Sequence, residues 1–539
     1  MSAFFASMGG VAGAPSGHAH VSDNKNAGPV HPRDFTATTD PTVTRQDVAN
    51  DNSEKGSLPS PTSSVDDAGN EQQHVIDPVA ERRLLRKIDL SVYPILFVVY
   101  MMSFLDRINI SNAKIQGMAV DLDLLEGNRF NIALFIYFIP YILLEVPSNM
   151  VIRKVRPSWY LAGLMACWGI INMCMGFVQT YQGLVVLRFF LGAFEAGVMP
   201  GIIYLTSMYY KRHEFQTRMS FFFCSTLIGG AFGGLLAYAI AHLGGSHGLA
   251  AWRWIYIIEG AITAGIALLA SFLIVDWPEQ CRFLTSAEKD LLRRRLAEDG
   301  AEQASMDTLN RQAIRLILRD YKIWLGSLVY MGVGVTGYAT TFFMPTILLE
   351  FGWLAADAQA RTIPVYLVSA AGMLLAAWAS DRLKHRSGFI LAGCAIATVG
   401  YAMLLGQAAL SRDAKFAAVF LVSLGGYLAT PIGLAWLANN LSGHWKRAFG
   451  SGTQVMLGNV AGIIASNIFL AGEAPRYPTG YGVALGMTWL GALATAALAL
   501  GLWLENRKRD RGGRDDRLLL PEEEVRNLGD DHPSFRFTL

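Results

Sequence analysis

The stretch Tyr100-Met-Met-Ser-Phe-Leu-Asp106-Arg107-Ile-Asn-Ile-Ser-Asn112 places a carboxylate and a guanidinium at the end of the first long apolar segment. Because a run of about 20 apolar residues spans a bilayer as a helix, this segment predicts a membrane-spanning helix. A charge at the centre of a bilayer costs roughly 2.5–3.5 kcal/mol on insertion scales, so an ionisable residue at membrane depth indicates a functional site. The alternative is a helix-end pair whose side chains reach the headgroups.

The composition is that of a membrane protein. Of 539 residues, 52% are hydrophobic and 16% are charged, whereas soluble domains carry about 25% charged residues. The formal net charge of +2 favours no nucleic-acid partner, and the five cysteines do not cluster as a zinc site or a disulfide framework would require. The sequence holds no P-loop, no Gly-x-Ser-x-Gly and no His-Glu-x-x-His motif. We therefore expect neither an enzyme nor an ATP-driven pump, and no metal or cofactor.

Twelve apolar segments, six on each side of a polar loop, predict an all-α membrane protein of two pseudo-symmetric six-helix bundles. The segments are 90–110, 130–151, 160–178, 183–208, 219–242 and 253–275, then 321–349, 362–380, 388–409, 415–438, 448–471 and 481–504. The predicted organisation is a disordered tail (1–80), an N-terminal bundle (81–275), a central loop (276–320), a C-terminal bundle (321–504) and a second tail (505–539). Three prolines inside segments predict kinks or helix ends: Pro140, Pro147 and Pro200.

Basic residues predict how the chain is oriented. They gather in the loops after segments 2, 4, 8 and 10, and they flank segments 1 and 12, whereas the opposite loops are poorer in them. The positive-inside rule then places both termini and the central loop in the cytoplasm. In that loop, Thr285 or Ser286 followed by Glu288 is typical of a helix start. We expect a monomeric multi-pass protein of the plasma membrane.

A second pair of charges lies in segment 4. Arg188 and Glu195 interrupt an apolar run, and their spacing of seven residues places them on one helical face. At 1.5 Å per residue, Asp106 and Arg188 lie at similar depths in the outer part of the membrane, and Glu195 lies about 10 Å deeper than Arg188. We expect these charges and Arg107 to share an internal cavity, where they can pair.

The stretch Ala377-Trp-Ala-Ser-Asp381-Arg382-Leu-Lys-His-Arg386 resembles the gating motif Gly-x-x-x-Asp-Arg-x-Gly-Arg-Arg of the major facilitator superfamily, with both glycines replaced. In the first half Arg153 stands where that motif has its aspartate, a departure typical of the anion:cation symporter branch. Five further stretches resemble the fungal allantoate-permease-like group of that branch: Asp106-Arg107-Ile-Asn-Ile-Ser-Asn-Ala113, Glu145-Val-Pro-Ser-Asn149, Arg188-Phe-Phe-Leu-Gly-Ala-Phe-Glu195-Ala-Gly-Val-Met-Pro200, Asn439-Asn440-Leu-Ser-Gly-His444-Trp-Lys-Arg447 and Glu473-Ala-Pro-Arg-Tyr-Pro-Thr-Gly-Tyr481.

This resemblance implies proton-coupled uptake of a small carboxylate or vitamin, such as allantoate, nicotinate, pantothenate or ureidosuccinate. It implies that Arg107 contacts the substrate carboxylate and that Asp106 and Glu195 carry protons. Further substrate-binding candidates are Arg188, Tyr137, Asn459, Gln454 and Thr430. The gating-loop candidates are Asp381, Arg382 and Arg153.

The predicted mechanism makes Asp106 an internal counter-ion of Arg107, whose protonation frees the guanidinium for an anion. Glu145 is expected to be a structural partner of a basic residue. Two other functions stay open. One is an exporter of a secondary metabolite by proton exchange, although segment 5 lacks the Gly-Pro pair of many exporters. The other is a transporter-like nutrient sensor.

Overall fold

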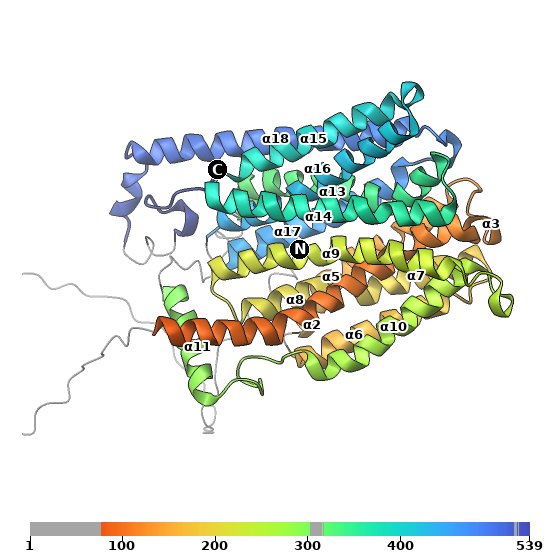
Figure 1. Cartoon of the computed structure of the whole chain (residues 1–539). Helices are drawn as coiled ribbons and strands as arrows, with labels where there is room; N and C mark the ends of the chain where they lie inside the picture. The colour runs from red at the N-terminus through yellow and green to blue at the C-terminus, as the bar shows by residue number, and fades with distance from the viewer. Residues whose placement is uncertain are drawn as a thin grey trace, which may run out of the picture. The chain divides into compact units, whose positions relative to one another are not determined.

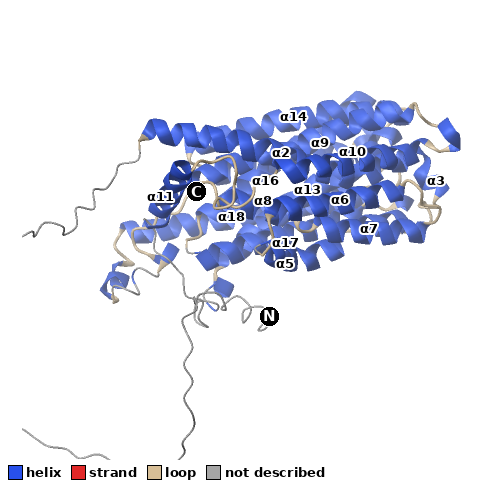
Figure 2. Ribbon diagram, turned by 90° about the horizontal axis from the view of Figure 1, so that it is seen from below, coloured by secondary structure: helices blue, strands red, loops and turns tan. Residues whose placement is uncertain are grey.

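The computed structural model describes residues 77–152, 154–301, 315, 317–442, 444–521, 525 and 528–539, which belong to one compact unit. Within these ranges the regular structure is helical, and no strand occurs (Figure 2). The residues up to 76 and the second part of the predicted central loop lie outside the described residues, so the predicted tail and that part of the loop stay predictions.

The first half of the unit crosses the membrane six times, and three of the crossings are made of more than one helix (Figure 1). Helix α2 continues through the π-helical turn η1 into α3, α4 continues into α5, and α7 continues into α8. The bounds are α2 Pro78–Ala113, η1 Lys114–Met118, α3 Ala119–Asp121, α4 Arg129–Phe135, α5 Phe138–Ile152, α6 Pro157–Met175, α7 Tyr181–Glu195, α8 Val198–Ser207, α9 Arg212–Ala241 and α10 Ala251–Leu273.

Helix α11 follows the first half, and the second half crosses the membrane with six single helices. The bounds are α11 Ser286–Ala301, α13 Tyr321–Glu350, α14 Ala355–Leu383, α15 Arg386–Leu405, α16 Arg412–Asn439, α17 His444–Ile468 and α18 Pro478–Asp510. Short 3-10 turns are η2 Ser246–Gly248, η3 Gln407–Ala409, η4 Ala471–Glu473, η5 Asp515–Leu519 and η6 Gly529–Asp531.

In the described part of the chain, 11 crossings are long and apolar enough to span a membrane on length and composition alone. The twelfth crossing is α17, in which Gln454, Asn459 and Asn467 interrupt an apolar sequence. Together these crossings confirm the predicted all-α fold with six helical crossings in each half. The least apolar crossing carries two of the predicted substrate-binding residues.

Two crossings break just before a proline. Pro140 has no N–H to bond the carbonyl of Ile136, and α4 ends at Phe135. Pro200 follows the break between α7 and α8, so that Glu195 is the last residue of α7. The kinks predicted at these two prolines are therefore present. Both breaks place a predicted site residue, Tyr137 or Glu195, where two helices meet.

Helices α9 and α14 join the two halves through close backbone contact. A Cβ on Gly234 would lie 2.4 Å from Thr362 Oγ1 and 3.0 Å from the Gln359 carbonyl oxygen, and a Cβ on Gly230 would lie 2.8 Å from the Tyr366 ring. Only glycine fits at that separation, which is how small residues bring membrane helices together.

We call the end of the unit at which α2 begins and α18 ends the tail end, and the opposite end the far end. At the far end, side chains of the first half bond to the second. The Gln116 amide donates to Gln359 Oε1 at 2.8 Å, and the Asn131 amide donates to the Ser466 carbonyl at 2.7 Å. The Lys114 ammonium lies 5.8 Å from the centre of the Phe343 ring of α13. These contacts hold the two halves together at the far end.

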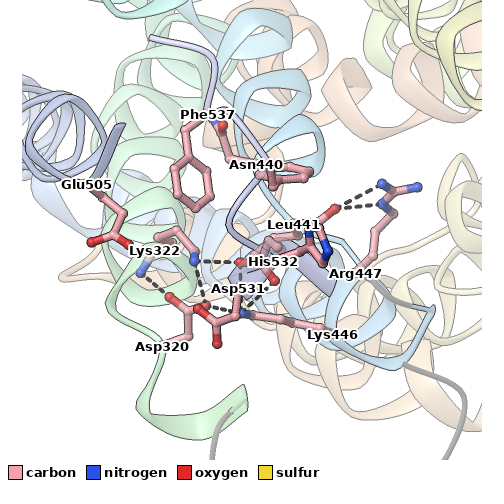
Figure 3. A network of polar contacts seen from close by, with 12 residues as sticks. Asp320, Lys322, Asn440, Leu441, Lys446, Arg447, Glu505, Asp531, His532 and Phe537 are labelled. Carbon is pink, nitrogen blue, oxygen red and sulfur yellow. Dashed lines mark hydrogen bonds and ion pairs between the residues drawn. The ribbon is translucent and has the colours of Figure 1, made fainter. Parts of the chain in front are cut away.

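At the tail end, residues 528–539 pack against the second half (Figure 3). The Asp530 carboxylate is buried and accepts hydrogen bonds from the Lys322 ammonium of α13 at 2.5 Å and the Lys446 ammonium of α17 at 2.9 Å. The Asn440 side chain, directly after α16, bonds to both backbone groups of Thr538, at 2.9 and 3.0 Å. This C-terminal segment therefore ties together the tail ends of three helices.

Helix α11 attaches to the first half at the tail end. Thr285 and Glu288 form the predicted helix start: the Thr285 N–H donates to Glu288 Oε2 at 2.8 Å, and the Glu288 N–H donates to Thr285 Oγ1 at 3.3 Å. Glu288 also pairs with Lys87 of α2 at 2.7 Å, and the buried Arg295 donates from Nε to Glu81 of α2 at 2.6 Å. The helix start predicted at Thr285 and Glu288 is thus confirmed.

Candidate functional site

The centre of the site is an ion pair between α2 and the end of α7. Arg107 donates from Nε to Glu195 Oε1 at 3.1 Å and also pairs with the same oxygen through its terminal nitrogen. The Ser103 hydroxyl, one turn earlier on α2, donates to that oxygen at 2.5 Å. Arg107 is 5% exposed and Glu195 is 1% exposed. Two predicted site residues thus neutralise each other inside the bundle.

Aromatic rings complete the surroundings of Arg107. The Tyr137 and Tyr141 ring centres lie 5.2 and 5.4 Å from the carbon of the guanidinium, within the range of cation–π attraction. Tyr137 reaches this position because the α4–α5 break approaches α7 closely. A Cβ on Gly192 would lie 2.0 Å from the Tyr137 carbonyl oxygen, so glycine is required there.

Asp106 faces away from Arg107, although the two residues are neighbours in the sequence. Its carboxylate accepts hydrogen bonds from Trp168 Nε1 at 3.1 Å, from the Asn172 amide at 2.7 Å and from Thr263 Oγ1 at 2.8 Å. These donors belong to α6 and α10, and Asp106 is fully buried among them. The prediction that Asp106 is the counter-ion of Arg107 is therefore wrong. Successive residues of a helix point about 100° apart, so Asp106 and Arg107 face different neighbours. The counter-ion beside Arg107 is Glu195.

Arg188 is also buried, but its guanidinium donates hydrogen bonds to a backbone carbonyl and not to a carboxylate. Both terminal nitrogens donate to the Arg107 carbonyl oxygen, at 3.3 and 3.4 Å, and Nε has no hydrogen-bond partner within the described ranges. This contact fixes α7 against α2 at the level of the ion pair. The structure brings Arg188 to the site as a positioning residue, behind Arg107.

The second half contributes a short chain of polar groups to the site. The Asn459 amide of α17 donates to Glu145 Oε2 of α5 at 3.3 Å, and the Tyr338 hydroxyl of α13 donates to Asn459 Oδ1 at 3.3 Å. Tyr338 in turn lies close enough to Arg107 to interact electrostatically with it. Asn459 is thus brought to the site as predicted. The partner of Glu145 is an amide of the other half and not the basic residue that we expected.

Two further predictions from the second half fall elsewhere. The Gln454 amide donates to the carbonyls of Gly326 and Gly433, at 3.2 and 3.0 Å, and so links α17 to α13 and α16. The Thr430 hydroxyl donates to the Gly426 carbonyl of its own helix at 2.9 Å. The structure does not bring either side chain to Arg107.

The gating-loop residues lie at the tail end of α14. Arg386 donates to Asp381 Oδ1 at 3.0 Å, and the Arg382 guanidinium lies 5.8 Å from the Trp378 ring centre. The Arg386 N–H donates to the terminal residue, Leu539, at 2.5 Å. Arg153, the third candidate, lies outside the described residues.

A small hollow lies between the halves, one turn beyond Arg107 towards the far end. It is lined by Ile108 and Asn112 of α2, Gly230 of α9, and Thr341, Thr362 and Tyr366 of the second half. No group of three His, Cys, Asp or Glu residues with the arrangement of a metal site occurs in the described ranges. The groups that the described residues bring together at this level are the guanidinium groups of Arg107 and Arg188, buried carboxyls, hydroxyls and amides.

Sequence reasoning missed several residues of the site. Ser103, Trp168, Asn172 and Thr263 are uncharged, and nothing in one sequence marks them among other polar residues of apolar helices. Glu259 of α10 is different. It is fully buried in the middle of an apolar run, and the criterion that selected Arg188 and Glu195 would also have selected it.

Comparison with known proteins relates the chain to transporters. The sequence matches the family model described as Major Facilitator Superfamily over residues 96–466. It is 34% identical over 478 residues to an uncharacterized transporter of Schizosaccharomyces pombe, covering 88% of this chain and 93% of that protein. It is 28% identical over 467 residues to the high-affinity nicotinic acid transporter of Saccharomyces cerevisiae, covering 85% of each.

The fold resembles two kinds of solved transporter. A D-xylose–proton symporter superposes with a TM-score of 0.59 at 13% identity, covering 77% of this chain and 97% of that one. A bacterial homologue of the human lysosomal transporter Spinster, in an inward-facing and occupied conformation, superposes with a TM-score of 0.56 at 16% identity, covering 79% and 97%. At these identities the likeness concerns the fold alone.

Proposed function

Since this chain belongs to the Major Facilitator Superfamily and is a multi-pass membrane transporter, we propose that it takes up a small organic anion together with protons, by alternating access of its two halves. The observation that carries the proposal is the buried Arg107–Glu195 pair, which faces Tyr338 and Asn459 of the opposite half. Transporters with repeated halves bind substrate near mid-membrane, where the halves meet.

The Arg107 guanidinium selects the charge of the substrate. It is a planar fork that matches a carboxylate with two parallel hydrogen bonds, and its attraction for an anion is stronger in a low-dielectric interior than in water. In the structure that position is held by the Glu195 carboxylate, which is the chemical group that we expect in the substrate. A substrate carboxylate therefore competes with Glu195 for the same donors.

Proton coupling follows from this competition. A protonated Glu195 carries no charge and releases Arg107, so that proton binding at Glu195 favours anion binding at Arg107. The Ser103 hydroxyl, 2.5 Å from Glu195 Oε1, can turn to accept the new proton. Glu195 thereby takes over the counter-ion role that the sequence assigned to Asp106.

The stoichiometry decides whether the membrane potential drives uptake. A net charge moved through 100 mV gains about 2.3 kcal/mol, so a monoanion must enter with more than one proton to benefit from an inside-negative potential. Glu195 supplies one proton site, and Asp106 is the second that we propose. The predicted placement of both termini in the cytoplasm of a plasma-membrane monomer belongs to the same proposal.

The relative that transports nicotinic acid supports an aromatic monocarboxylate as the first substrate to test. Tyr137, Tyr141 and Tyr338 lie around Arg107 and offer ring faces to such a molecule. We propose nicotinate and related small carboxylates as the substrate class.

The test is transport by the purified full-length protein in lipid vesicles. Labelled nicotinate and a panel of small carboxylates are added outside, with an acid-outside gradient and a potassium–valinomycin potential set independently. We expect accumulation that is abolished by a protonophore. Efflux under the acid-outside gradient would instead identify an exporter, and saturable binding without flux would identify a sensor.

A further inference from the structure

The carboxylate of Glu259 is a buried acidic group that the proposed transport cycle does not use. Glu259 lies in the middle of α10, is 0% exposed, and neither of its oxygens has a hydrogen-bond partner among the described residues. Unpartnered polar atoms inside a protein are uncommon and costly, so such a group calls for a physical explanation.

The packing of α10 on α2 places Glu259 opposite Asn109. Thr263 donates to Asp106 at 2.8 Å, which fixes the register of the two helices. The helices run in opposite directions, so one turn towards the far end leads from Thr263 to Glu259 on α10 and from Asp106 to Asn109 on α2. The amide of Asn109 is fully buried, has no other hydrogen-bond partner among the described residues, and lies close enough to Glu259 to interact with it.

Among the described residues, no cation contacts Glu259: Lys114 of η1 lies over the Phe130 ring, and the buried Arg188 of α7 interacts with Tyr256 of α10. The charged group that interacts with Glu259 is the Asp106 carboxylate, which is of the same sign. Helix α6 contains no Asp, Glu, Lys, Arg or His, and the charged residues of α9 lie at its tail-end start. Tyr256 and Arg253 are the titratable groups one and two turns away on α10 itself, and Arg253 bonds to the Gly176 and Val178 carbonyls.

The two carboxyls have opposite surroundings. Asp106 accepts three hydrogen bonds, which favour its ionised form, whereas Glu259 accepts none. When the environments of two neighbouring acids differ in this way, one acid is ionised and the other stays protonated. Two charges without a cation would repel each other across a low-dielectric interior.

We propose that Asp106 and Glu259 form a proton-binding pair that holds one proton in this structure, with the proton on Glu259 and the negative charge on Asp106. A protonated Glu259 can donate to Asn109 Oδ1 while its carbonyl oxygen accepts from the Asn109 amide, which satisfies all four unpartnered atoms. The role of this pair in transport rests on the proposed function; its protonation does not.

The first experiment is infrared difference spectroscopy of the purified protein in lipid nanodiscs near neutral pH, without substrate. A protonated carboxyl in apolar surroundings has a carbonyl stretch that is separate from the amide bands. We expect Glu259→Gln to lose one such band. The matched control is Glu195→Gln, which removes a buried glutamate at similar depth that is ion-paired with Arg107, and should lose none. An unchanged band in Glu259→Gln, or a wild-type protein without any such band, would overturn the proposal.

A second variant keeps the test decisive if Glu259→Gln fails to fold. Asn109→Leu removes the proposed hydrogen-bond partner but keeps the carboxyl, so the band should persist and shift to higher frequency. A band that does not move would contradict the pairing. The oxygens of Glu259 and Asn109 could also bind a sodium ion. A band that disappears on adding sodium chloride, but not on adding choline chloride, would show that sodium and not a proton is bound there, and would overturn the proposal. Because no substrate is used, these outcomes are independent of whether the transported molecule is an anion.

Discussion

The guanidinium of Arg107 closes onto a single carboxylate oxygen of Glu195, a residue 88 positions later in the chain. The other oxygen of Glu195 has no hydrogen-bond partner among the described residues. Only one of the two Glu195 oxygens is therefore hydrogen-bonded, and the pair lies where the two halves of the transporter meet. An anion that replaces Glu195 and a proton that neutralises it act on the same contact.

Removing Arg107 alone gives a result that is difficult to interpret. Arg107→Ala should abolish uptake, but it also leaves the buried Glu195 without a counter-ion, and breaking a buried pair costs about 3–5 kcal/mol. The informative variant is Arg107→Gln combined with Glu195→Gln, which removes both charges and leaves a polar amide at each position. We expect this double variant to reach the membrane with near-normal thermal stability and to take up no nicotinate. Wild-type uptake would disprove the substrate role of Arg107.

Glu195→Gln separates proton coupling from binding. The amide accepts hydrogen bonds from Arg107 through its oxygen but cannot take up a proton, so substrate should still cross while the proton gradient no longer drives it. We expect exchange of labelled for unlabelled substrate to continue and acid-driven accumulation to fall to the equilibrium level. If both activities are lost to the same extent, Glu195 has a binding or structural role.

The sequence predicts which helices carry the site and not how their side chains pair. Asp106, Arg107, Arg188 and Glu195 were all identified because charges in apolar helices are costly. Adjacency in sequence suggested that Asp106 neutralises Arg107, but a helix turns the two side chains to different neighbours. Pairing depends on which helix faces each side, and that is a property of the whole bundle.

The second half illustrates the same limit. Gln454 and Asn459 lie five residues apart on α17, and both are polar amides in an apolar helix. One bonds to backbone carbonyls of α13 and α16, and the other bonds to Glu145 across the interface between the halves. A spacing of five residues turns the side chain by about 140°, so only the position of the neighbouring helices distinguishes a structural amide from a site amide.

Gly192→Ala tests the close approach that positions Tyr137. The added Cβ would lie 2.0 Å from the Tyr137 carbonyl oxygen, a backbone atom that cannot move without shifting the α4–α5 break. Overpacking of this kind costs about 1–3 kcal/mol. We expect a clear drop in the thermal unfolding temperature in detergent and reduced uptake. Gly163→Ala on α6 is the control, because nothing lies within 4 Å of its added Cβ. Equal stability of the two variants would contradict the packing argument.

Asn459→Ala tests the contact between the halves. It removes a donor to Glu145 and an acceptor for Tyr338, and a net hydrogen bond contributes about 1 kcal/mol. We expect nicotinate uptake to fall by about fivefold or more, since 1.4 kcal/mol corresponds to a factor of ten. Asn467→Ala, whose amide bonds within its own helix at the exposed side, is the matched control. Similar uptake by both variants would remove Asn459 from the site.

Asp530→Asn tests the C-terminal segment at the tail end. Burial alone would raise the pKa of the Asp530 carboxyl, but the Lys446 and Lys322 ammonium groups hold this pKa below its ordinary value. A carboxyl whose pKa is lower in the folded state stabilises that state above its ordinary pKa, and the stabilisation is lost as the pH falls through the ordinary value towards the folded one. Near neutral pH we expect Asp530→Asn to lower the unfolding temperature by less than the about 3–5 kcal/mol of a fully broken buried pair, because Asp320 still pairs with Lys322 and Lys446.

The pH series and a surface control complete this test. The difference in unfolding temperature between the wild type and Asp530→Asn should shrink as the pH is lowered towards and below the ordinary carboxyl pKa of 3.8. Asp510→Asn removes the exposed partner of Arg536 in the same segment and should change stability by less than about 1 kcal/mol at any pH. A constant difference across the series would mean that Asp530 acts through its shape and not through its charge. In that case the contacts of Asn440 with Thr538, which do not titrate, would account for the docking of the segment.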